Sequence, residues 1–359
     1  MYDNMANKVF DLNALPVAGW LRALPGAAPA ADASKPQIAV GRGPIADMAL
    51  DPYTGQLYVT NPTDNSLAVI DTDTLTVTQV ITDLAEAHSV VAAGGNAYVS
   101  TVTEDGDTVS VLDTALYAGG EVATDVFGVG EAVRDLALSP EGERVYAARS
   151  GAGIAVVDII TGSVSTIAVP GAAEASAEAI AVSLDGRKAY LVTADYNGGQ
   201  LIAVDTVYQR VVGVRALPTQ PHAVSISRDG STLLVARCDP QAGTDLDIID
   251  AASLHVMETV AVAGLVTDMV FSVAGERIYL VAGGRVKVLD ASTMQTIETF
   301  TGVAAPSCIA ESADGSMLYV ADYDGNVSTL SVGEVTDELL AQMMSTDIIN
   351  VPVLELARA

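Results

Sequence analysis

A short motif that ends in Asp recurs along the chain at intervals of 40 to 47 residues. Each copy is an apolar run followed by Asp and a polar turn, as in "AVIDTDTLT" (68–76). The motif ends at Asp71, Asp113, Asp158, Asp205, Asp250 and Asp290, and a seventh copy ends at Ser331. A fixed period of about 40 to 45 residues is typical of propeller or solenoid arrays. The short runs of Val, Ile, Thr and Tyr between Gly, Asp and Asn favour strands over helices.

Each repeat unit predicts four strands. The first two are joined by a tight turn at an Asp-Gly or Glu-Gly pair, as in "AIAVSLDGRKAYLV" (179–192), because Gly tolerates positive φ. The strand-ending Asp can accept hydrogen bonds from backbone amides of the turn that follows it. A Tyr recurs at one register of the second strand, and we expect its ring to pack between neighbouring units. The register holds Tyr58, Tyr98, Tyr146, Tyr190, Leu234, Tyr279 and Tyr319.

The segment "LYVTN" (57–61), followed by "AVIDT" (68–72), resembles the YVTN family of seven-bladed β-propeller repeats. The resemblance covers residues 36–332 and implies an all-β ring of seven four-stranded antiparallel blades. The family is found often in surface-associated proteins of bacteria and archaea, which implies an extracytoplasmic or cell-envelope setting, with the cytoplasm as the alternative. No Gly-His/Trp-Asp signature accompanies the repeat, so the WD40 class fits less well.

The repeat divides the chain into three parts. Residues 1–36 are an extension that ends in an Ala/Pro linker, 37–332 form the propeller, and 333–359 form a second extension. Residues 7–21 and 334–345 are predicted to be weakly helical. The seventh unit has three strands, so we expect residues 37–41 to supply its outer strand and close the ring. The alternative is that the tail "NVPVLELARA" adds an edge strand there.

Composition limits the partners. Forty-five acidic residues against 17 basic ones give a formal net charge of −28, which disfavours nucleic acid and anionic membranes. No apolar run approaches the roughly 20 residues of a membrane helix. The N-terminus lacks the basic stretch of a signal peptide. Cys238 and Cys308 are predicted to be two separate buried thiols.

Ligands of propellers commonly bind around the central channel, where the innermost strands begin. Alignment on the recurring Tyr gives two adjacent registers there and a third at the end of the second strand. The first register holds Asp47, His88, Asp135, Ala179, Ala223, Asp268 and Cys308, with blade 2 one residue shorter than the others. The second holds Ala46, Ala87, Arg134, Glu178, His222, Thr267 and Ser307, and the third includes Arg149 and Arg237. The predicted ligand-binding residues are Asp47, His88, Arg134, Asp135, Arg149, Glu178, His222, Arg237 and Asp268.

The sequence lacks the motifs that are typical of several enzyme classes. Three histidines are too few for a multi-copper site, and there is no c-type haem motif, phosphate loop or Gly-x-Ser-x-Gly nucleophile. Hairpins at 103–107 and 322–326 carry clustered Asp, but turn chemistry explains them better than calcium. His255 is predicted to be exposed or structural on an outer hairpin.

We therefore expect a non-catalytic binding or interaction module without a cofactor, which recognises a protein or a small polar ligand through its top face or blade edges. One alternative is a metal-assisted, lactonase-like hydrolase with a divalent cation at the channel mouth. The other alternative is a subunit that docks into a larger assembly through its terminal extensions.

Overall fold

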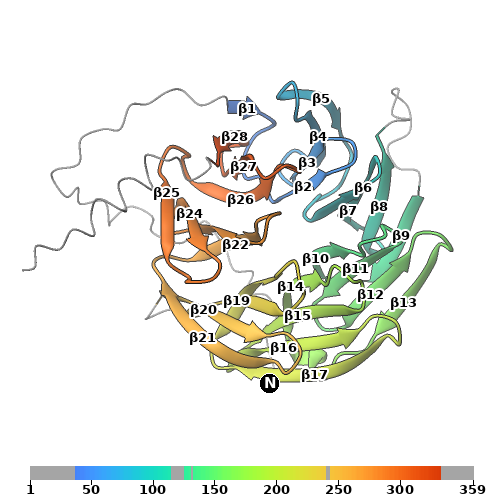
Figure 1. Cartoon of the computed structure of the whole chain (residues 1–359). Helices are drawn as coiled ribbons and strands as arrows, with labels where there is room; N and C mark the ends of the chain where they lie inside the picture. Colours follow the sequence, from blue (N-terminus) through green and yellow to red (C-terminus); the bar gives the residue numbers. More distant parts are fainter. Residues whose placement is uncertain (1–36, 115–124, 131, 240–242, 333–359) are drawn as a thin grey trace, which may run out of the picture. The chain divides into compact units, whose positions relative to one another are not determined.

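The computed structural model describes residues 37–114, 125–130, 132–239 and 243–332. Within these residues the chain forms seven sheets, each of four antiparallel strands. Residues Lys35–Ala359 make up one unit and Met1–Ser34 another, and the latter lies wholly outside the described residues. The strands are numbered along the chain and drawn in Figure 1.

Blades 1 to 6 each run from an inner strand to an outer strand in chain order. Blades 1 and 2 consist of β2 (Asp47–Asp51), β3 (Gln56–Asn61), β4 (Ser66–Asp71), β5 (Thr76–Ile81), β6 (Val90–Ala93), β7 (Asn96–Thr103), β8 (Gly106–Asp113) and β9 (Asp125–Gly130). Blades 3 and 4 consist of β10 (Val133–Leu138), β11 (Arg144–Arg149), β12 (Gly153–Asp158), β13 (Ser163–Ile167), β14 (Ser176–Val182), β15 (Lys188–Asp195), β16 (Gly198–Asp205) and β17 (Arg210–Leu217). A short 3-10 helix, η2 (Ala172–Glu174), precedes β14.

Blades 5 and 6 consist of β18 (Gln220–Ile226), β19 (Thr232–Asp239), β20 (Gly243–Asp250), β21 (His255–Val262), β22 (Val266–Phe271), β23 (Arg277–Ala282), β24 (Arg285–Asp290) and β25 (Thr296–Phe300). Blade 7 takes three strands from the end of the repeat and a fourth from its start: β26 (Pro306–Glu311), β27 (Met317–Asp322), β28 (Asn326–Ser331) and β1 (Gln37–Ala39).

The ring is closed by the strand that the sequence predicts. β1 pairs antiparallel with β28, with Ile38 opposite Val327, and Figure 1 shows the two side by side. Around the ring each inner strand contacts the inner strand of the next blade, and β26 of blade 7 contacts β2 of blade 1. This arrangement leaves blade 7 without an open edge at β28. The alternative closure by the C-terminal tail lies outside the described residues, as do both predicted helical segments.

The strand-ending Asp fixes the turn between the third and outer strands. The Asp71 Oδ1 atom accepts hydrogen bonds from the backbone N and the hydroxyl of Thr74, each at 2.8 Å. Asp158 and Thr161 repeat the arrangement at 2.9 and 2.8 Å. The predicted turn chemistry is confirmed, and it explains why Asp recurs at this register.

The recurring Tyr lies buried between blades, as predicted. The exposed fraction of this side chain is 3% or less at all seven positions, Leu234 included. The Tyr58 hydroxyl lies 3.0 Å from Thr114 Oγ1 of blade 2, and the Tyr190 hydroxyl donates to the Ala251 carbonyl of blade 5 at 3.0 Å. Each of these partners directly follows a strand-ending Asp. In these two blades the ring and its hydroxyl therefore join one blade to the third-strand turn of the next, whereas the Tyr279 hydroxyl donates to Glu311 of the inner strand of blade 7 at 3.1 Å.

Cys308 is buried and Cys238 is half-buried, and neither forms a disulfide. The prediction of two buried thiols is therefore wrong for Cys238, which stands near the end of β19. His255 is exposed at the start of β21, which agrees with the prediction that it is exposed or structural on an outer hairpin.

Candidate functional site

Two consecutive residues of every blade line a central cavity of about 190 Å³ where the inner strands begin. In a regular strand, neighbouring side chains point to opposite faces. Here a bulge breaks the alternation: Val133 pairs with Arg149 and Asp135 with Ala148, so Arg134 is the extra residue. The same bulge occurs at Glu178, His222 and Thr267. In blades 3 to 6 the bulge turns two side chains toward the axis.

The cavity is lined by two rings of side chains. The first, which we call the mouth ring, consists of Ala46, His88, Arg134, Glu178, His222, Thr267 and Ser307. The second, the channel ring, consists of the residues that follow them: Asp47, Ser89, Asp135, Ala179, Ala223, Asp268 and Cys308.

In blade 2 the two ring positions lie one residue later in the chain than the sequence register predicts. Ala46 N donates to the Thr60 carbonyl at 3.1 Å and Asp47 N to the Thr60 hydroxyl at 3.0 Å. In blade 2 the matching bonds to Ser100 come from His88 N at 3.2 Å and Ser89 N at 2.9 Å. Ser89 therefore takes the position of Asp47, and His88 belongs to the mouth ring, where the sequence register had placed Ala87.

The channel-ring carboxylates join neighbouring blades. Asp135 Oδ1 accepts the backbone N–H of Leu136 in its own strand at 2.8 Å, and Asp135 Oδ2 accepts that of Ile180 in blade 4 at 2.8 Å. Asp268 bonds Ile309 of blade 7 in the same way at 2.8 Å. Charged acceptors make the stronger class of hydrogen bond. These side chains are therefore structural fasteners at the axis, a role that sequence reasoning missed although Asp recurs at one register.

Ser89 links three blades. Its hydroxyl donates to Asp47 Oδ2 at 2.9 Å and lies 3.2 Å from Asp135 Oδ1. It also accepts the backbone N–H of Leu136 at 3.1 Å. Asp47 Oδ2 accepts Val90 N at 2.9 Å as well, so blades 1, 2 and 3 are joined around one hydroxyl.

The channel ring concentrates acidic groups away from water. Burial, reinforced by the negative charge of Asp135, raises the pKa of Asp47 to about 8. Burial likewise raises the pKa of Asp135 and of Asp268 to about 6. Burial, with the charges of Asp268 and Asp47, also raises the pKa of the Cys308 thiol well above its usual value. The thiol therefore stays neutral near pH 7, where it is a weak nucleophile.

These shifts predict that stability falls as pH rises from 5 to 8. A carboxyl whose pKa is raised by folding keeps its proton in the native state after the unfolded chain has lost it, so each pH increment up to the folded pKa favours unfolding. We expect the thermal midpoint to drop over this range, and the drop to shrink in Asp47→Ala. Asp71→Ala is the control, because turn hydrogen bonds lower the pKa of Asp71 and confine its effect to acid pH. A pH profile of the Asp47→Ala midpoint parallel to that of the parent protein would contradict the assignment.

The mouth ring contrasts with the channel ring. No side-chain hydrogen bond joins His88, Arg134, Glu178 or His222 to another residue in the part of the chain that the structure describes. Burial of the imidazole and the positive charge of Arg134 both lower the pKa of His88. Burial lowers the pKa of His222, and the negative charge of Glu178 partly offsets this shift. Both imidazoles are therefore neutral near pH 7 and offer one donor and one acceptor each.

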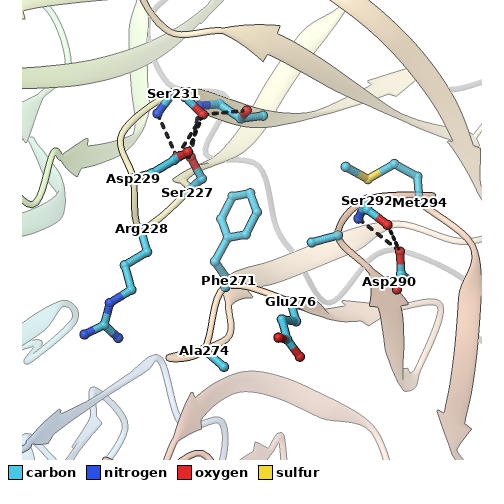
Figure 2. Close-up of a pocket in the computed structure, with 13 residues that line it drawn as sticks. Ser227, Arg228, Asp229, Ser231, Phe271, Ala274, Glu276, Asp290, Ser292 and Met294 are labelled. Carbon is cyan, nitrogen blue, oxygen red and sulfur yellow. Dashed lines mark hydrogen bonds between the residues drawn. The ribbon is translucent and has the colours of Figure 1, made fainter.

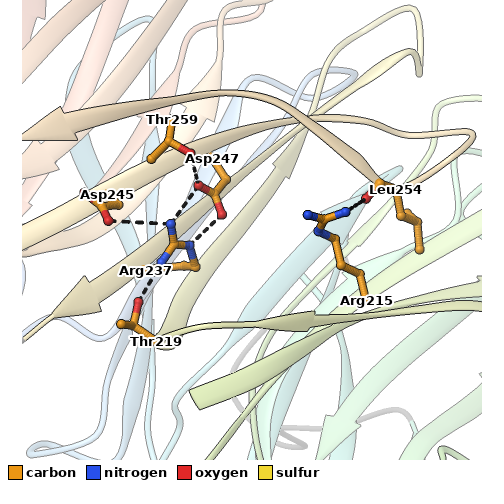
Figure 3. Close-up of polar contacts among 7 residues, drawn as sticks. All are labelled: Arg215, Thr219, Arg237, Asp245, Asp247, Leu254 and Thr259. Carbon is orange, nitrogen blue, oxygen red and sulfur yellow. Dashed lines mark hydrogen bonds and ion pairs between the residues drawn. The ribbon is translucent and has the colours of Figure 1, made fainter. Parts of the chain in front are cut away.

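Arg149 and Arg237, predicted at the mouth, do not line this cavity. Arg149 is buried between blades 2 and 3: it donates to the Val129 carbonyl of β9 in blade 2 at 2.5 Å and to Thr166 Oγ1 of blade 3 at 3.1 Å. Arg237 is buried within blade 5, where its guanidinium bonds Asp247 at 2.5 and 2.8 Å (Figure 3). The second strand has no bulge at these positions, so each side chain packs on a face of its sheet and does not turn toward the axis.

Among the described residues, no three His, Cys, Asp or Glu side chains are grouped so that they could hold a metal ion. The carboxylates of the acidic hairpin loops accept hydrogen bonds from backbone N–H groups of the propeller. Asp322 Oδ1 accepts the backbone N–H groups of Asp324 and Asn326 at 2.9 and 2.8 Å, and Asp107 Oδ2 accepts Val133 N at 2.7 Å. Within the same residues, no helix has the length and apolar character needed to span a bilayer.

A comparison with curated proteins decides the family. The chain is 30% identical over 348 residues to the seven-bladed beta-propeller protein Rv1057 of Mycobacterium tuberculosis, and the match covers 85% of this chain and 87% of that protein. The chain belongs to the seven-bladed β-propeller proteins. No protein-family model matches it.

Two solved structures share the propeller fold. Hydrazine synthase of Kuenenia stuttgartiensis superposes with a TM-score of 0.72 at 18% identity, over 82% of this chain and 97% of that one. The beta-propeller domain of Cps50 (Swd1) from Myceliophteria thermophila gives 0.69 at 14% identity, over 83% and 100%. At these identities the likeness concerns the fold alone.

Proposed function

We propose that this seven-bladed propeller is a non-catalytic binding module whose mouth ring recognises a small polar ligand or a polar side chain of a partner protein. The observation that supports it is the contrast between the rings. The channel-ring carboxylates bond neighbouring blades, whereas four polar side chains of the mouth ring have no hydrogen-bond partner among the described residues. Converging polar groups without internal partners are suited to fix a ligand.

The mouth ring favours a ligand of mixed charge. Arg134 stands next to His88 and supplies a cation with several donors for a carboxylate or phosphate. Glu178 stands next to His222 and supplies an acceptor for an ammonium or guanidinium group. The acidic channel ring below disfavours a ligand with negative charge alone.

The test uses three probes of similar size: glycylglycine, which carries both charges, succinate and putrescine. Calorimetric titration is expected to give saturable binding for glycylglycine and weaker binding for the other two. Arg134→Ala and Glu178→Gln each remove a hydrogen bond to a charged group and are expected to weaken binding about 10-fold or more. Arg187→Ala and Glu143→Gln, at the far ends of the inner strands, are the controls. Equal binding of all three probes, or unchanged binding in the mouth variants, would reject the site.

Two finer assignments complete the proposal. The repeat is assigned to the YVTN type on "LYVTN" and "AVIDT", and the setting is assigned to the cell envelope on that resemblance. The alternative of a metal-assisted hydrolase finds no support in the grouping of donors among the described residues. The alternative of docking through the terminal extensions concerns residues outside that part of the chain.

A further inference from the structure

The junction between blades 5 and 6 departs from the repeat. Elsewhere in the ring a buried Tyr fills the register that Leu234 occupies in blade 5. Tyr190 reaches Ala251, the residue after the strand-ending Asp of the next blade. The matching residue opposite Leu234 is Ala291, and Leu234 has neither the ring nor the hydroxyl to reach it. The junction therefore lacks a large side chain and one hydrogen bond between blades.

A cavity of about 710 Å³ opens at this junction. Its apolar floor is formed by Phe271, Ala291 and Met294, which are only partly buried and pack against the cluster that contains Leu234. Figure 2 shows the Phe271 ring between the turn at Ser227–Ser231 and the turn that carries Ser292 and Met294. The cavity thus presents an aromatic ring and a thioether at the surface, both adaptable contacts for an apolar side chain.

A second cavity of about 500 Å³ lies between blades 4 and 5. It shares Arg228, Asp229 and Ser231 with the first, so the two are adjacent lobes of one surface, on either side of the blade 5 turn. Leu184, which is 56% exposed, lines the second lobe. We call this surface the blade 4–6 groove.

The groove is acidic. Asp185, Asp229, Asp250, Glu276 and Asp290 line it, against Lys188 and Arg228. Turn hydrogen bonds lower the pKa of Asp290 to about 2 and also lower that of Asp185, Asp229 and Asp250, so these groups are ionised at neutral pH. The turn donors of Asp290 all reach Oδ1.

The groove is separate from the axial mouth. Inner strands begin at the mouth and end at the first hairpin turn, and both lobes are built from first hairpin turns and third-strand turns. A molecule in the groove would therefore contact the end of the inner strands opposite to the mouth ring.

We propose that the blade 4–6 groove docks an extended basic–apolar segment of a partner protein. One apolar side chain packs on Phe271 and Met294, and a second enters the lobe at Leu184. Basic side chains between them meet the carboxylates of Glu276 and Asp290. The apolar floor and the excess of ionised carboxylates complement these two features of the segment.

The test measures fluorescence anisotropy of three labelled nine-residue peptides at low salt. In one Leu alternates with Lys, in the second Glu replaces Lys, and in the third Ser replaces Leu. We expect the Leu/Lys peptide to bind, with an affinity that falls as salt is raised. We expect the Leu/Glu and Ser/Lys peptides to bind at least 10-fold more weakly.

Glu276→Lys is the groove variant, and Glu143→Lys is its matched control at the same register of blade 3. Both side chains are exposed, so thermal midpoints should stay close to that of the parent protein. Binding of the Leu/Lys peptide is expected to weaken about 10-fold in Glu276→Lys and to stay within 2-fold in Glu143→Lys. The proposal is overturned if the peptide does not bind, if the Ser/Lys peptide binds equally well, or if both variants lose affinity alike.

Discussion

Replacing Arg237 with Ala is expected to lower the free energy of unfolding by about 3 to 5 kcal/mol, because removing one partner of a buried ion pair leaves an uncompensated charge. Asp247, which is 2% exposed, would keep only the hydroxyl of Thr259 at 2.7 Å (Figure 3). Arg237 also donates to Thr219 Oγ1 at 2.7 Å and lies 3.5 Å from an Asp245 oxygen. Urea denaturation of the parent protein and of Arg237→Ala measures the loss.

A double variant tests the cause of that loss. In Arg237→Met with Asp247→Leu no buried charge remains, and apolar residues of similar volume replace the pair. Such replacements are often neutral or stabilising, so we expect the double variant to recover most of the lost stability. If the double variant is at least as unstable as Arg237→Ala, the cost comes from lost packing or from the hydrogen bonds to Thr219 and Thr259, and the charge explanation is wrong.

Removing the closing strand is expected to destabilise blade 7 by roughly 3 to 5 kcal/mol, from the burial of one Ile side chain and a small set of hydrogen bonds. Ile38 is 8% exposed and packs in the cluster that contains Val327. Val40 N and Gly41 N both donate to the Gly325 carbonyl, at 2.9 and 3.2 Å. The unpaired edge of β28 is also expected to promote self-association.

Two truncations isolate this strand. One begins at residue 37 and keeps β1, and the other begins at residue 42 and lacks it. We expect only the shorter protein to show a lower thermal midpoint and a shift to larger species in gel filtration, relative to the protein that begins at 37. Equal midpoints and equal elution would show that β1 does not close the ring in solution.

The fold could be predicted because its determinants recur. Seven strand-ending positions and seven Tyr-register positions mark each blade independently, and both are set by local chemistry: a turn that needs an acceptor and a junction that needs a large side chain. The closing strand could be predicted because blade 7 has three strands of its own and the chain offers a matching apolar strand at 37–41.

The positions of the candidate residues were predicted in part. Arg134, Glu178 and His222 were placed correctly at the mouth, but His88 was assigned one position away from its ring because blade 2 is one residue shorter. The hydrogen bond of Ser89 with Ser100, which mirrors that of Asp47 with Thr60, fixes the register, and it becomes visible only in the structure.

Arg149 and Arg237 were predicted at the mouth because they end strands there, and strand position alone does not say which way a side chain points. An Asp at 247, in the middle of an apolar strand, was the available sign that a cation lies buried beside it. The bonds from channel-ring Asp side chains to the next blade depend on the spacing between blades, which the repeat period does not encode.

The channel ring fastens the seven blades unequally. Asp47, Asp135 and Asp268 bind the next blade directly, and Ser89 joins blades 2 and 3. Blades 4 and 5 have Ala179 and Ala223 at this register, and blade 7 has Cys308, whose thiol is bonded, among the described residues, only within its own strand. The sector from blade 4 to blade 6 therefore lacks these axial bonds, and it is also where Leu234 replaces Tyr. We expect local opening fluctuations of the ring to be largest in this sector, so that neighbouring blades separate more easily here than elsewhere in the ring.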